Sequence, residues 1–403
     1  MDLIGRASNM GILQKHIPQL RFPDFLNDGE WEVKRLGEVC RLTNGMAFKP
    51  SDWIETGIPI VRIQNLNDEN APFNYCAPEI IDDRCMIDTG TLLFSWSGTP
   101  GTSFGAFIWN RGKAVLNQHI FIVKPVEIDK VFLKMAIDAN MTSIIEKSHG
   151  GAGLRHITKS DFEDIRISVP KDIAEQRRIA ACLFALDEIL SATNEKLERL
   201  KTYKKGLMQK LFPAKGKKLP ELRIKEFEKD GEWEEKKLAT IVHQITTGKL
   251  DANAMVSNGE YRFYTCAKDY AFINEYAFDT EALLISGNGA HLGYIHYYKG
   301  KFNAYQRTYV LSDFQCDIFY LKYYLESFLP DRINKEKKEG NTPYIVLSTL
   351  TEMDISLPSN FEQHKIADCL TSIDEMINQY TNKVTFLELY KKGLMQQLFP
   401  TSK

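Results

Sequence analysis

Residues 173–212 read IAEQRRIAACLFALDEILSATNEKLERLKTYKKGLMQKLF, and this stretch decides the fold. From Ile179 to Leu200, apolar residues and one threonine recur in alternating steps of four and three, and we extend the stripe through Tyr203. Steps averaging 3.5 residues are typical of a left-handed coiled-coil seam. A helix of this length spans about 60 Å at 1.5 Å per residue. A narrow apolar stripe does not stabilise such a helix alone, so the pattern predicts a partner helix.

A second stretch, residues 361–400, supplies that partner. It reads FEQHKIADCLTSIDEMINQYTNKVTFLELYKKGLMQQLFP and repeats YKKGLMQ, which also stands at residues 203–209. Its stripe begins at Ile366, which follows Ile179 by 187 residues. The predicted coiled-coil and partner-docking positions are Ile179, Leu183, Leu186, Leu190, Leu197, Leu200, Ile366, Leu370, Ile373, Ile377, Val384 and Leu387.

The segments before the two helices are also repeated. Residues 17–39 read IPQLRFPDFLNDGEWEVKRLGEV, and residues 219–241 read LPELRIKEFEKDGEWEEKKLATI. LLFSWSG at Leu92 matches LLISGNG at Leu283, and LNQHIFIV at Leu116 matches AYQRTYVL at Ala304. Framing segments are shared while the loops between them differ, which indicates one scaffold that presents two different surfaces.

The repeat predicts an α+β fold with internal pseudo-two-fold symmetry. Short β-rich runs, among them residues 58–64, precede a helical segment in each half (residues 129–147 and 317–338). This order favours α+β over a doubly wound sheet. One long helix leads out of the first half and the other leads back, so we expect them to pack antiparallel. The expected parts are a flexible tail (1–16), an N-terminal head (17–172), a central helix (173–213), a C-terminal head (214–360) and a second helix (361–403).

Composition is compatible with this plan. The 403 residues are 43% hydrophobic and 26% charged, with a formal net charge of −2. No apolar run approaches the roughly 18 residues of a membrane span. The seven cysteines form no C-x-x-C pair, so neither a zinc site nor a disulfide framework is predicted, and we expect a cytoplasmic protein. A net charge near zero still permits a local basic patch for nucleic acid.

The framing motifs resemble those of the specificity subunit of type I restriction–modification enzymes. Each half opens with LR-x-x-x-F and GEWE-x-K-x-L and closes with EQ-x-x-IA-x-x-L and YKKGLMQ-x-LF. The resemblance covers almost the whole chain, from about Ile17 to Pro400. It implies two target-recognition domains joined by an antiparallel coiled coil, in which each domain reads one half of a bipartite, asymmetric DNA site.

The resemblance also implies partners and cofactors. The helices would set the spacing between half-sites and dock two methyltransferase subunits, which restriction/translocase subunits would join. The chain itself would be non-catalytic and would bind no cofactor. S-adenosylmethionine would belong to the methyltransferase subunits that modify adenine N6, and ATP and Mg would belong to the restriction subunits.

Polar residues in the loops of the heads are the candidate DNA contacts. Arg suits guanine and Asn or Gln suits adenine, whereas Lys and Ser or Thr more often hold phosphates. In the N-terminal head these candidates are Asn44, Lys49, Arg62, Gln64, Asn65, Ser95, Trp96, Ser97, Thr99, Asn117, Gln118, His119, Arg155 and Lys159. In the C-terminal head they are Lys249, Tyr264, Lys268, Ser286, Asn288, His291, Tyr305, Gln306, Arg307, Asn341 and Tyr344. The aligned pairs Gln118/Gln306 and His119/Arg307 are the strongest, since both heads keep a polar residue there.

Other interpretations compete with this one. A coiled-coil scaffold whose two heads bind proteins is the main alternative, and an enzyme with a site in one head is a weaker one. SGNGAHLG at residues 286–293 has the wrong glycine spacing for a dinucleotide loop, and a strand-like segment follows it. The acidic pairs Glu175/Glu362 and Asp187/Asp374 are expected to be solvated or to face a partner.

Overall fold

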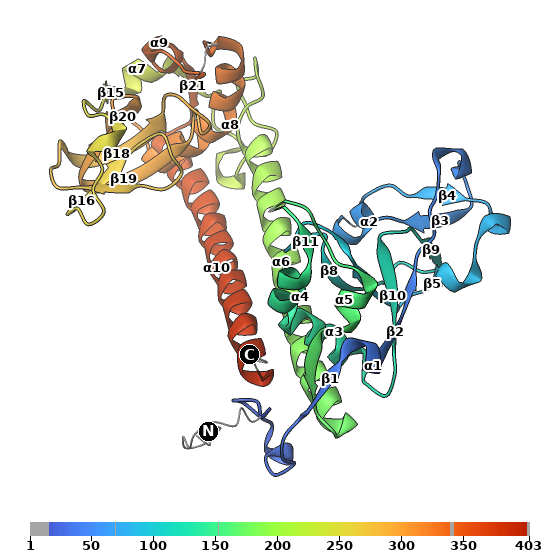
Figure 1. The fold of residues 1–403 in the computed structure, drawn as a ribbon. Coiled ribbons are helices and arrows are strands. Elements are labelled where there is room, and N and C mark those ends of the chain that lie inside the picture. The colour runs from blue at the N-terminus through green and yellow to red at the C-terminus, as the bar shows by residue number, and fades with distance from the viewer. Residues whose placement is uncertain (1–15, 69, 152, 339–341, 401–403) are drawn as a thin grey trace. The chain divides into compact units, whose positions relative to one another are not determined.

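The structure is a computed structural model that describes residues 16–68, 70–151, 153–338 and 342–400 (Figure 1). The chain divides into two compact units. Unit 1 comprises Met1–Ala192 and Val384–Lys403, and unit 2 comprises Thr193–Lys383. Each unit therefore contains one head and a part of both long helices.

The two long helices begin and end close to the predicted residues. Helix α6 spans Ile173–Leu211 and α10 spans Asn360–Leu398. Asp172 starts α6 by accepting a hydrogen bond from the Ala174 N–H (2.8 Å), and Ser359 accepts one from the Glu362 N–H (3.3 Å) at the start of α10. Such side-chain caps satisfy amide groups that have no partner within the helix.

Within each unit the helix segments run antiparallel. In unit 1, Asp187 pairs with Lys391, and Leu183 shares a core with Leu398 nearer the start of α6. In unit 2, Lys204 pairs with Asp374, and Leu211 shares a core with Leu370. All of the predicted coiled-coil positions are buried or half-buried: Ile179, Leu183, Leu186, Leu190, Leu197, Leu200, Ile366, Leu370, Ile373, Ile377, Val384 and Leu387.

One extension of the stripe is wrong. Tyr203 and Tyr390 are 60% and 52% exposed, whereas the side chains of Lys204 and Lys391 are only 16% and 24% exposed. The alternating steps of four and three residues continue from Leu200 to Lys204 and then to Leu207. A lysine therefore occupies the inward position in each helix, and the neighbouring tyrosine points outward.

The N-terminal head contains two main sheets. The larger sheet has the order β2-β10-β6-β8 and is antiparallel, and the smaller has the order β4-β3-β9-β5 with β3 and β9 parallel. Two small sheets, β1-β13 and β11-β12-β7, complete the head. The elements are β1 (Glu32–Arg35), α1 (Leu36–Val39), β2 (Cys40–Asn44), β3 (Ile58–Val61), α2 (Ile63–Asn67), β4 (Asn74–Cys76), β5 (Met86–Ile87), β6 (Leu92–Ser95), β7 (Ser97–Gly98), β8 (Gly105–Ile108), β9 (Ala114–Leu116), β10 (Ile120–Pro125), α3 (Lys130–Ala139), α4 (Met141–Lys147), β11 (His149–Gly150), β12 (Arg155–His156), α5 (Lys159–Glu163) and β13 (Arg166–Val169).

The C-terminal head contains one larger sheet with the order β15-β20-β18-β19-β16-β17, and a small sheet, β14-β21. Within the larger sheet only β16 and β19 pair in parallel. The elements are β14 (Glu234–Lys237), α7 (Leu238–Ile241), β15 (Val242–Thr247), β16 (Tyr261–Tyr264), β17 (Ala271–Ile273), β18 (Phe278–Ser286), β19 (Ile295–Ala304), β20 (Thr308–Phe314), α8 (Ile318–Glu336), α9 (Leu347–Thr351) and β21 (Asp354–Leu357).

The central strands are apolar on both faces because both faces are covered. In β10, Phe121 and Val123 enter the core beneath α3, while Ile120 and Ile122 enter a second core on the other face. In β18, Leu283 and Ala282 divide between two cores in the same way. Alternate residues of a strand point to opposite faces, so such strands show a continuous apolar run instead of an alternating pattern.

The C-terminal end of each long helix contributes to the core of a head, α10 to the N-terminal head and α6 to the C-terminal head. Leu398 and Phe399 are buried in the core of the N-terminal head, and Leu211 and Phe212 are buried in the core of the C-terminal head. The Leu20 N–H donates to the carbonyl of Gln397 (3.0 Å), and the Leu222 N–H donates to that of Lys210 (2.9 Å). The first of these bonds places the IPQLR segment (residues 17–21) beside the end of α10, and the second places the matching LPELR segment (residues 219–223) beside the end of α6.

Candidate nucleic-acid interface

Two equivalent loops lie at the centre of the candidate residues, one in each head. The 117–119 loop joins β9 to β10, and the 305–307 loop joins β19 to β20. In the N-terminal head three backbone hydrogen bonds hold the loop: Asn117 N–H to Val61 O (3.0 Å), Trp96 N–H to His119 O (3.1 Å) and Gly45 N–H to Ile120 O (3.1 Å).

The C-terminal head makes the same three bonds at the aligned positions. They join the Tyr305 N–H to Tyr264 O (2.9 Å), the Gly287 N–H to Arg307 O (2.8 Å) and the Gly248 N–H to Thr308 O (3.3 Å). The backbone of the loop is therefore held in the same way in both heads, while its side chains are Asn-Gln-His in one and Tyr-Gln-Arg in the other.

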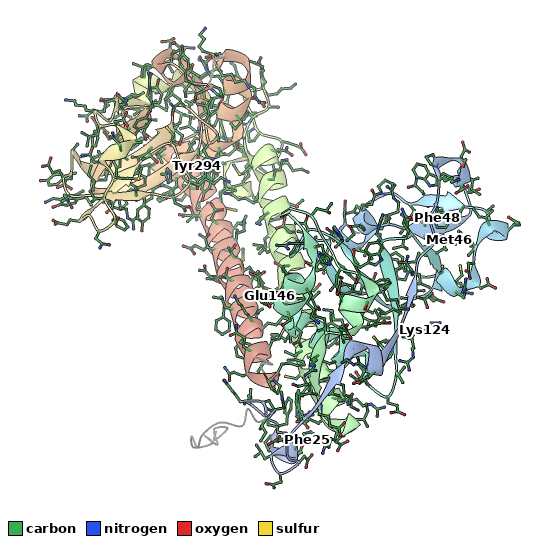
Figure 2. The ribbon with its side chains drawn as sticks, in the orientation of Figure 1. Phe25, Met46, Phe48, Lys124, Glu146 and Tyr294 are labelled. Atoms are coloured by element: carbon green, nitrogen blue, oxygen red, sulfur yellow. The ribbon has the colours of Figure 1, made fainter. Side chains whose placement is uncertain are left out.

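A glycine beside each loop permits this close approach. A Cβ atom on Gly45 would lie 2.1 Å from the carbonyl oxygen of Asn117, and one on Gly248 would lie 1.7 Å from that of Ala304. Neither contact is possible for a real side chain, so both positions require glycine. Beyond Gly45, Met46 and Phe48 pack against the core of the β4-β3-β9-β5 sheet (Figure 2).

Two cavities flank the 117–119 loop. A polar one of about 190 Å³ is lined by residues that include Arg62, Gln64, Asn117 and His119. A more apolar one of about 380 Å³ is lined by Asn44, Trp96, Phe121, His156, Ile157, Thr158 and Lys159. The ring of Trp96 lies edge-on against His119 with centroids 4.9 Å apart, so the two cavities adjoin. Seven of the predicted DNA contacts therefore lie together in this head.

The corresponding cavity of the C-terminal head measures about 400 Å³. It is lined by Ile245, Thr246, Thr247, Gly287, Gln306, Arg307, Tyr309, Ile345 and Leu347. Gln306 and Arg307 are exposed at its edge, and burial raises the pKa of the Tyr309 phenol beside them. The repeat alignment places Gly287 where the other head has Trp96, and Leu347 where it has Lys159. Trp96 and Lys159 are predicted DNA contacts, whereas their equivalents Gly287 and Leu347 are not.

Four predicted DNA contacts are buried, and the structure removes them from the interface. Ser95 and Ser286 are fully buried at the ends of β6 and β18, and Tyr264 is 2% exposed in a core of the C-terminal head. Asn65 is 3% exposed, and its side chain bonds the backbone at Arg62, Ala71 and Pro72. The Ser95 hydroxyl likewise donates to the Ser97 carbonyl (3.0 Å), whereas the Ser286 hydroxyl has no partner among the described residues. Residue type alone does not reveal that such side chains are buried.

The remaining candidates that the structure describes line none of these three cavities. Ser97 and Arg155 lie in the sheet β11-β12-β7, and Thr99 donates to the Gly153 carbonyl beside it. Asn288 forms a β-bridge to Tyr344. Lys49, Gln118, Lys249 and Lys268 are exposed, and Tyr305 and His291 are half-buried. Asn341 lies outside the described residues.

Aromatic–arginine clusters were missed by sequence reasoning. Arg111 lies over the rings of Phe73 (4.8 Å) and Trp109 (4.7 Å) in the N-terminal head. Arg262 lies between Tyr270 (4.3 Å) and Tyr298 (4.6 Å) in the C-terminal head. Phe73 and Tyr298 are distant in sequence from their arginines. Trp109 and Tyr270 are nearer but follow no repeat, so no sequence pattern marked the clusters.

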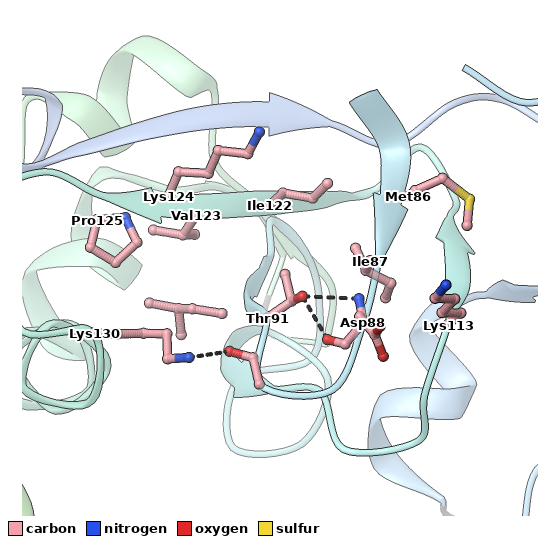
Figure 3. A pocket seen from close by; sticks show the side chains of 12 residues that line it. Met86, Ile87, Asp88, Thr91, Lys113, Ile122, Val123, Lys124, Pro125 and Lys130 are labelled. Atoms are coloured by element: carbon pink, nitrogen blue, oxygen red, sulfur yellow. Dashed lines mark hydrogen bonds between the residues drawn. The ribbon is translucent and has the colours of Figure 1, made fainter. Parts of the chain in front are cut away.

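A basic groove of about 530 Å³ lies apart from the 117–119 loop (Figure 3). It is at the Leu92 end of β6 and the Pro125 end of β10, whereas the 117–119 loop precedes the other end of β10. Three lysines, Lys113, Lys124 and Lys130, surround it, and Lys130 donates to the Gly90 carbonyl (2.6 Å). The groove contains none of the candidate DNA contacts.

The Glu175/Glu362 pair is not solvated as expected, whereas the side chains of Asp187 and Asp374 are 32% and 28% exposed. Glu175 is 1% exposed and accepts two hydrogen bonds from Arg21 (2.7 and 2.8 Å) and one from Trp31 (3.3 Å). Glu362, also 1% exposed, accepts two from Arg223 (2.9 and 2.8 Å). These glutamates fix the start of each helix to the adjacent head, so that prediction was wrong.

Neither a membrane span nor a metal cluster is found in the described part of the chain. No helix there is long and apolar enough to cross a membrane. No three His, Cys, Asp or Glu side chains there are grouped so that they could hold a metal ion.

Comparison with known proteins finds the same family in both halves. The family model of the type I restriction modification DNA specificity domain matches residues 28–202 and 230–385. The chain is 25% identical over 420 residues to the type I restriction enzyme MjaVIII specificity subunit of Methanocaldococcus jannaschii, covering 95% of this chain and 94% of that protein. It is 39% identical over 142 residues to the EcoDI specificity subunit of Escherichia coli, covering 35% of this chain and 31% of that protein.

Solved structures share the fold. The crystal structure of a type I restriction–modification S subunit from M. genitalium has a TM-score of 0.67 at 17% identity, covering 96% of this chain and 100% of that one. A chain from a study of complex assembly and conformational transition of the type I R-M system has a TM-score of 0.52 at 16% identity, covering 91% and 97%. At these identities the likeness establishes the fold.

Proposed function

Because the chain belongs to the type I restriction–modification DNA specificity family, we propose that its two heads read the two halves of a bipartite, asymmetric DNA site. The helices α6 and α10 set the spacing between these half-sites and dock two methyltransferase subunits. The chain is the non-catalytic recognition subunit, and S-adenosylmethionine belongs to the methyltransferases that it positions. ATP and Mg belong to restriction subunits that join the same complex.

The observation that carries this proposal is the pair of equivalent loops. The same three backbone hydrogen bonds hold residues 117–119 and 305–307, but the side chains that the loops present differ. Base recognition requires rigidly placed donors and acceptors at a groove of the duplex. One scaffold with different side chains suits a DNA site whose two halves are unlike.

Exposed aromatic residues on the helices support docking of two identical partners. Tyr203 is 60% exposed, and its repeat equivalent Tyr390 is 52% exposed. Exposed apolar residues mark interaction surfaces when they gather in patches, and Phe386 stacks on Tyr390 with centroids 6.0 Å apart. Phe386 has no counterpart in the first repeat, where residue 199 is Arg, but the exposed tyrosine recurs in both. An exposed position that occurs once in each repeat suits a partner that binds once to each repeat.

Methylation sequencing tests the proposal. The chain is co-expressed with its methyltransferase partner in a host without other adenine methylation, and modified adenines are mapped by single-molecule sequencing. The expected result is one bipartite motif with a fixed gap between two unlike halves. A stable complex that modifies no such motif would favour a scaffold whose heads bind proteins.

A further inference from the structure

Arg307 differs from every other arginine of the candidate interface in having a fixed backbone and an unengaged side chain. Its carbonyl accepts hydrogen bonds from the Gly287 N–H (2.8 Å) and the Cys266 thiol (3.5 Å). The N–H of the preceding residue, Gln306, donates to the Leu250 carbonyl (2.9 Å), and this bond also holds the backbone of the loop. Across the residues that the structure describes, the Arg307 guanidinium forms no hydrogen bond or ion pair, and the residue is exposed.

The other candidate arginines are already occupied. Arg62 donates to Asn74 (3.0 Å), and Arg155 lies within a small sheet and reaches the Ser148 carbonyl (3.5 Å). A guanidinium that already bonds to protein groups has fewer free donors for a base.

In the N-terminal head the position equivalent to Arg307 is occupied by His119, and its surroundings differ. His119 is half-buried beside Trp96, and its Nδ1 atom is buried without a partner among the described residues. In the C-terminal head Gly287 replaces Trp96, and a Cβ atom there would lie 2.3 Å from the Arg307 carbonyl oxygen. No side chain can therefore cover Arg307 from this side.

We propose that Arg307 reads a guanine in the half-site of the C-terminal head, and that this contact distinguishes that half-site from the other. The inference rests on the proposed function. An arginine fork matches the O6 and N7 acceptors that guanine presents in the major groove. A fixed backbone and an unengaged fork are the two properties that such a contact needs, because ordering a mobile loop would cost affinity.

The test measures which base pair Arg307 discriminates. The purified complex of the chain with its methyltransferase is assayed on duplexes in which each base pair of the C-terminal half-site is replaced in turn. Arg307→Ala is expected to slow methylation of the cognate duplex by about 5- to 150-fold. It is also expected to abolish discrimination at one G·C pair while leaving discrimination at all other positions unchanged.

Two further variants complete the design. Arg307→Gln keeps a long polar side chain and is expected to shift the preference at that position from guanine towards adenine, the base that glutamine fits. His119→Ala is the matched control at the equivalent position. It should leave discrimination between base pairs of the C-terminal half-site unchanged. Because Arg307 is exposed, its variants should unfold at the same temperature as the parent chain, which establishes that they are folded.

Three results would overturn the proposal. They are a C-terminal half-site without a G·C pair, unchanged discrimination in Arg307→Ala, and a uniform loss of rate on every duplex, which would identify a phosphate contact. Failure of the proposed function gives a different result, since the complex that contains the parent chain would then methylate no bipartite site at all.

Discussion

At the residue scale, one buried glutamate connects each long helix to a head, but the two glutamates do not accept the same number of hydrogen bonds. Glu175 accepts a hydrogen bond from the Trp31 indole (3.3 Å) in addition to those from Arg21. The equivalent Trp233 is 4% exposed, and its indole nitrogen has no partner among the described residues. The same motif is therefore complete in unit 1 and lacks one bond in unit 2.

This difference predicts unequal effects of the same substitution. Trp31→Phe removes packing and a hydrogen bond to a carboxylate, whereas Trp233→Phe removes packing and an unsatisfied buried donor. We expect Trp31→Phe to cost about 1.5 kcal/mol more, since bonds to charged groups contribute about 1.5–3 kcal/mol. Hydrogen exchange in the two cores measures the loss unit by unit, and equal losses would show that the indole bond contributes nothing.

A buried thiol predicts a dependence of stability on pH. Burial raises the pKa of Cys40 to about 12, and its Sγ atom donates to the Leu36 carbonyl (3.1 Å). An unfolded cysteine has a pKa of about 8.5, so above that pH the unfolded chain loses a proton that the folded chain keeps. The stability that this group contributes is complete below pH ~8.5 and is lost as the pH rises towards 12, by at most about 1.4 kcal/mol per pH unit.

The Cys40→Ala variant lacks this contribution. Its free energy of unfolding in urea should therefore fall less steeply between pH ~8.5 and ~10.5 than that of the parent chain, although its stability at pH 7 is lower because packing is lost. Parallel curves for the two proteins would contradict the assignment.

Residue roles were predictable only where the repeat constrained them. The alignment singled out the equivalent pairs Gln118/Gln306 and His119/Arg307, and the structure places each pair on equivalent loops. It could not show that Ser95 or Tyr264 is buried, because burial depends on strand ends and packing that residue type does not encode. Glu175 was misjudged because its partner, Arg21, lies 154 residues away in the sequence.

At the element scale, each antiparallel helix pair contains a lysine at an inward position. Lys204 contacts Asp374 (2.7 Å) and Glu326 (3.5 Å) and lies 4.8 Å from the centre of the Tyr323 ring. The equivalent Lys391 pairs with Asp187. Polar residues at such positions fix the register of a coiled coil at some cost in stability.

Removing the two lysine charges should have different effects. Lys204→Met leaves Asp374 without its cation and removes the contact with the Tyr323 ring, whereas Glu326 keeps Lys322 (2.6 Å). We expect a loss of about 1–2 kcal/mol. Lys391→Met leaves one partly exposed carboxylate and should cost less than about 1 kcal/mol. Urea unfolding measures both, with Lys205→Met, an exposed neighbour in α6, as the control. A loss in that control equal to the loss in Lys204→Met would exclude a specific role for the inward lysine.

The long helices were predicted well, and the short helices and strands less well. The bounds of α6 and α10 agree with the predicted stripes because the 3.5-residue repeat persists over many turns. The run from residue 58 to 64 was predicted as one strand but ends at Val61 and continues as α2 from Ile63. The predicted helix over residues 129–147 is divided at Asn140 into α3 and α4. Both breaks are capping effects within a few residues, which periodicity does not resolve.

At the scale of the whole molecule, the repeat predicts that recognition is modular. Exchanging residues 250–341 for the matching stretch of a relative replaces the loops of the C-terminal head and leaves residues 117–119 and both helices unchanged. The methylated motif should then change in one half only, with the other half and the gap retained. Changes in both halves would contradict modular reading, and single-molecule sequencing of modified adenines distinguishes the outcomes.

The contribution of Leu398 and Phe399 to the core of the N-terminal head has a consequence for synthesis. A ribosome completes Leu183 some 215 residues before Leu398, a delay of roughly 10–40 s at usual elongation rates. During this interval the nascent N-terminal head exposes the apolar surface that these residues later cover. Chaperones that bind such surfaces therefore have a defined period in which to act on this chain, and it ends only after both heads have been translated.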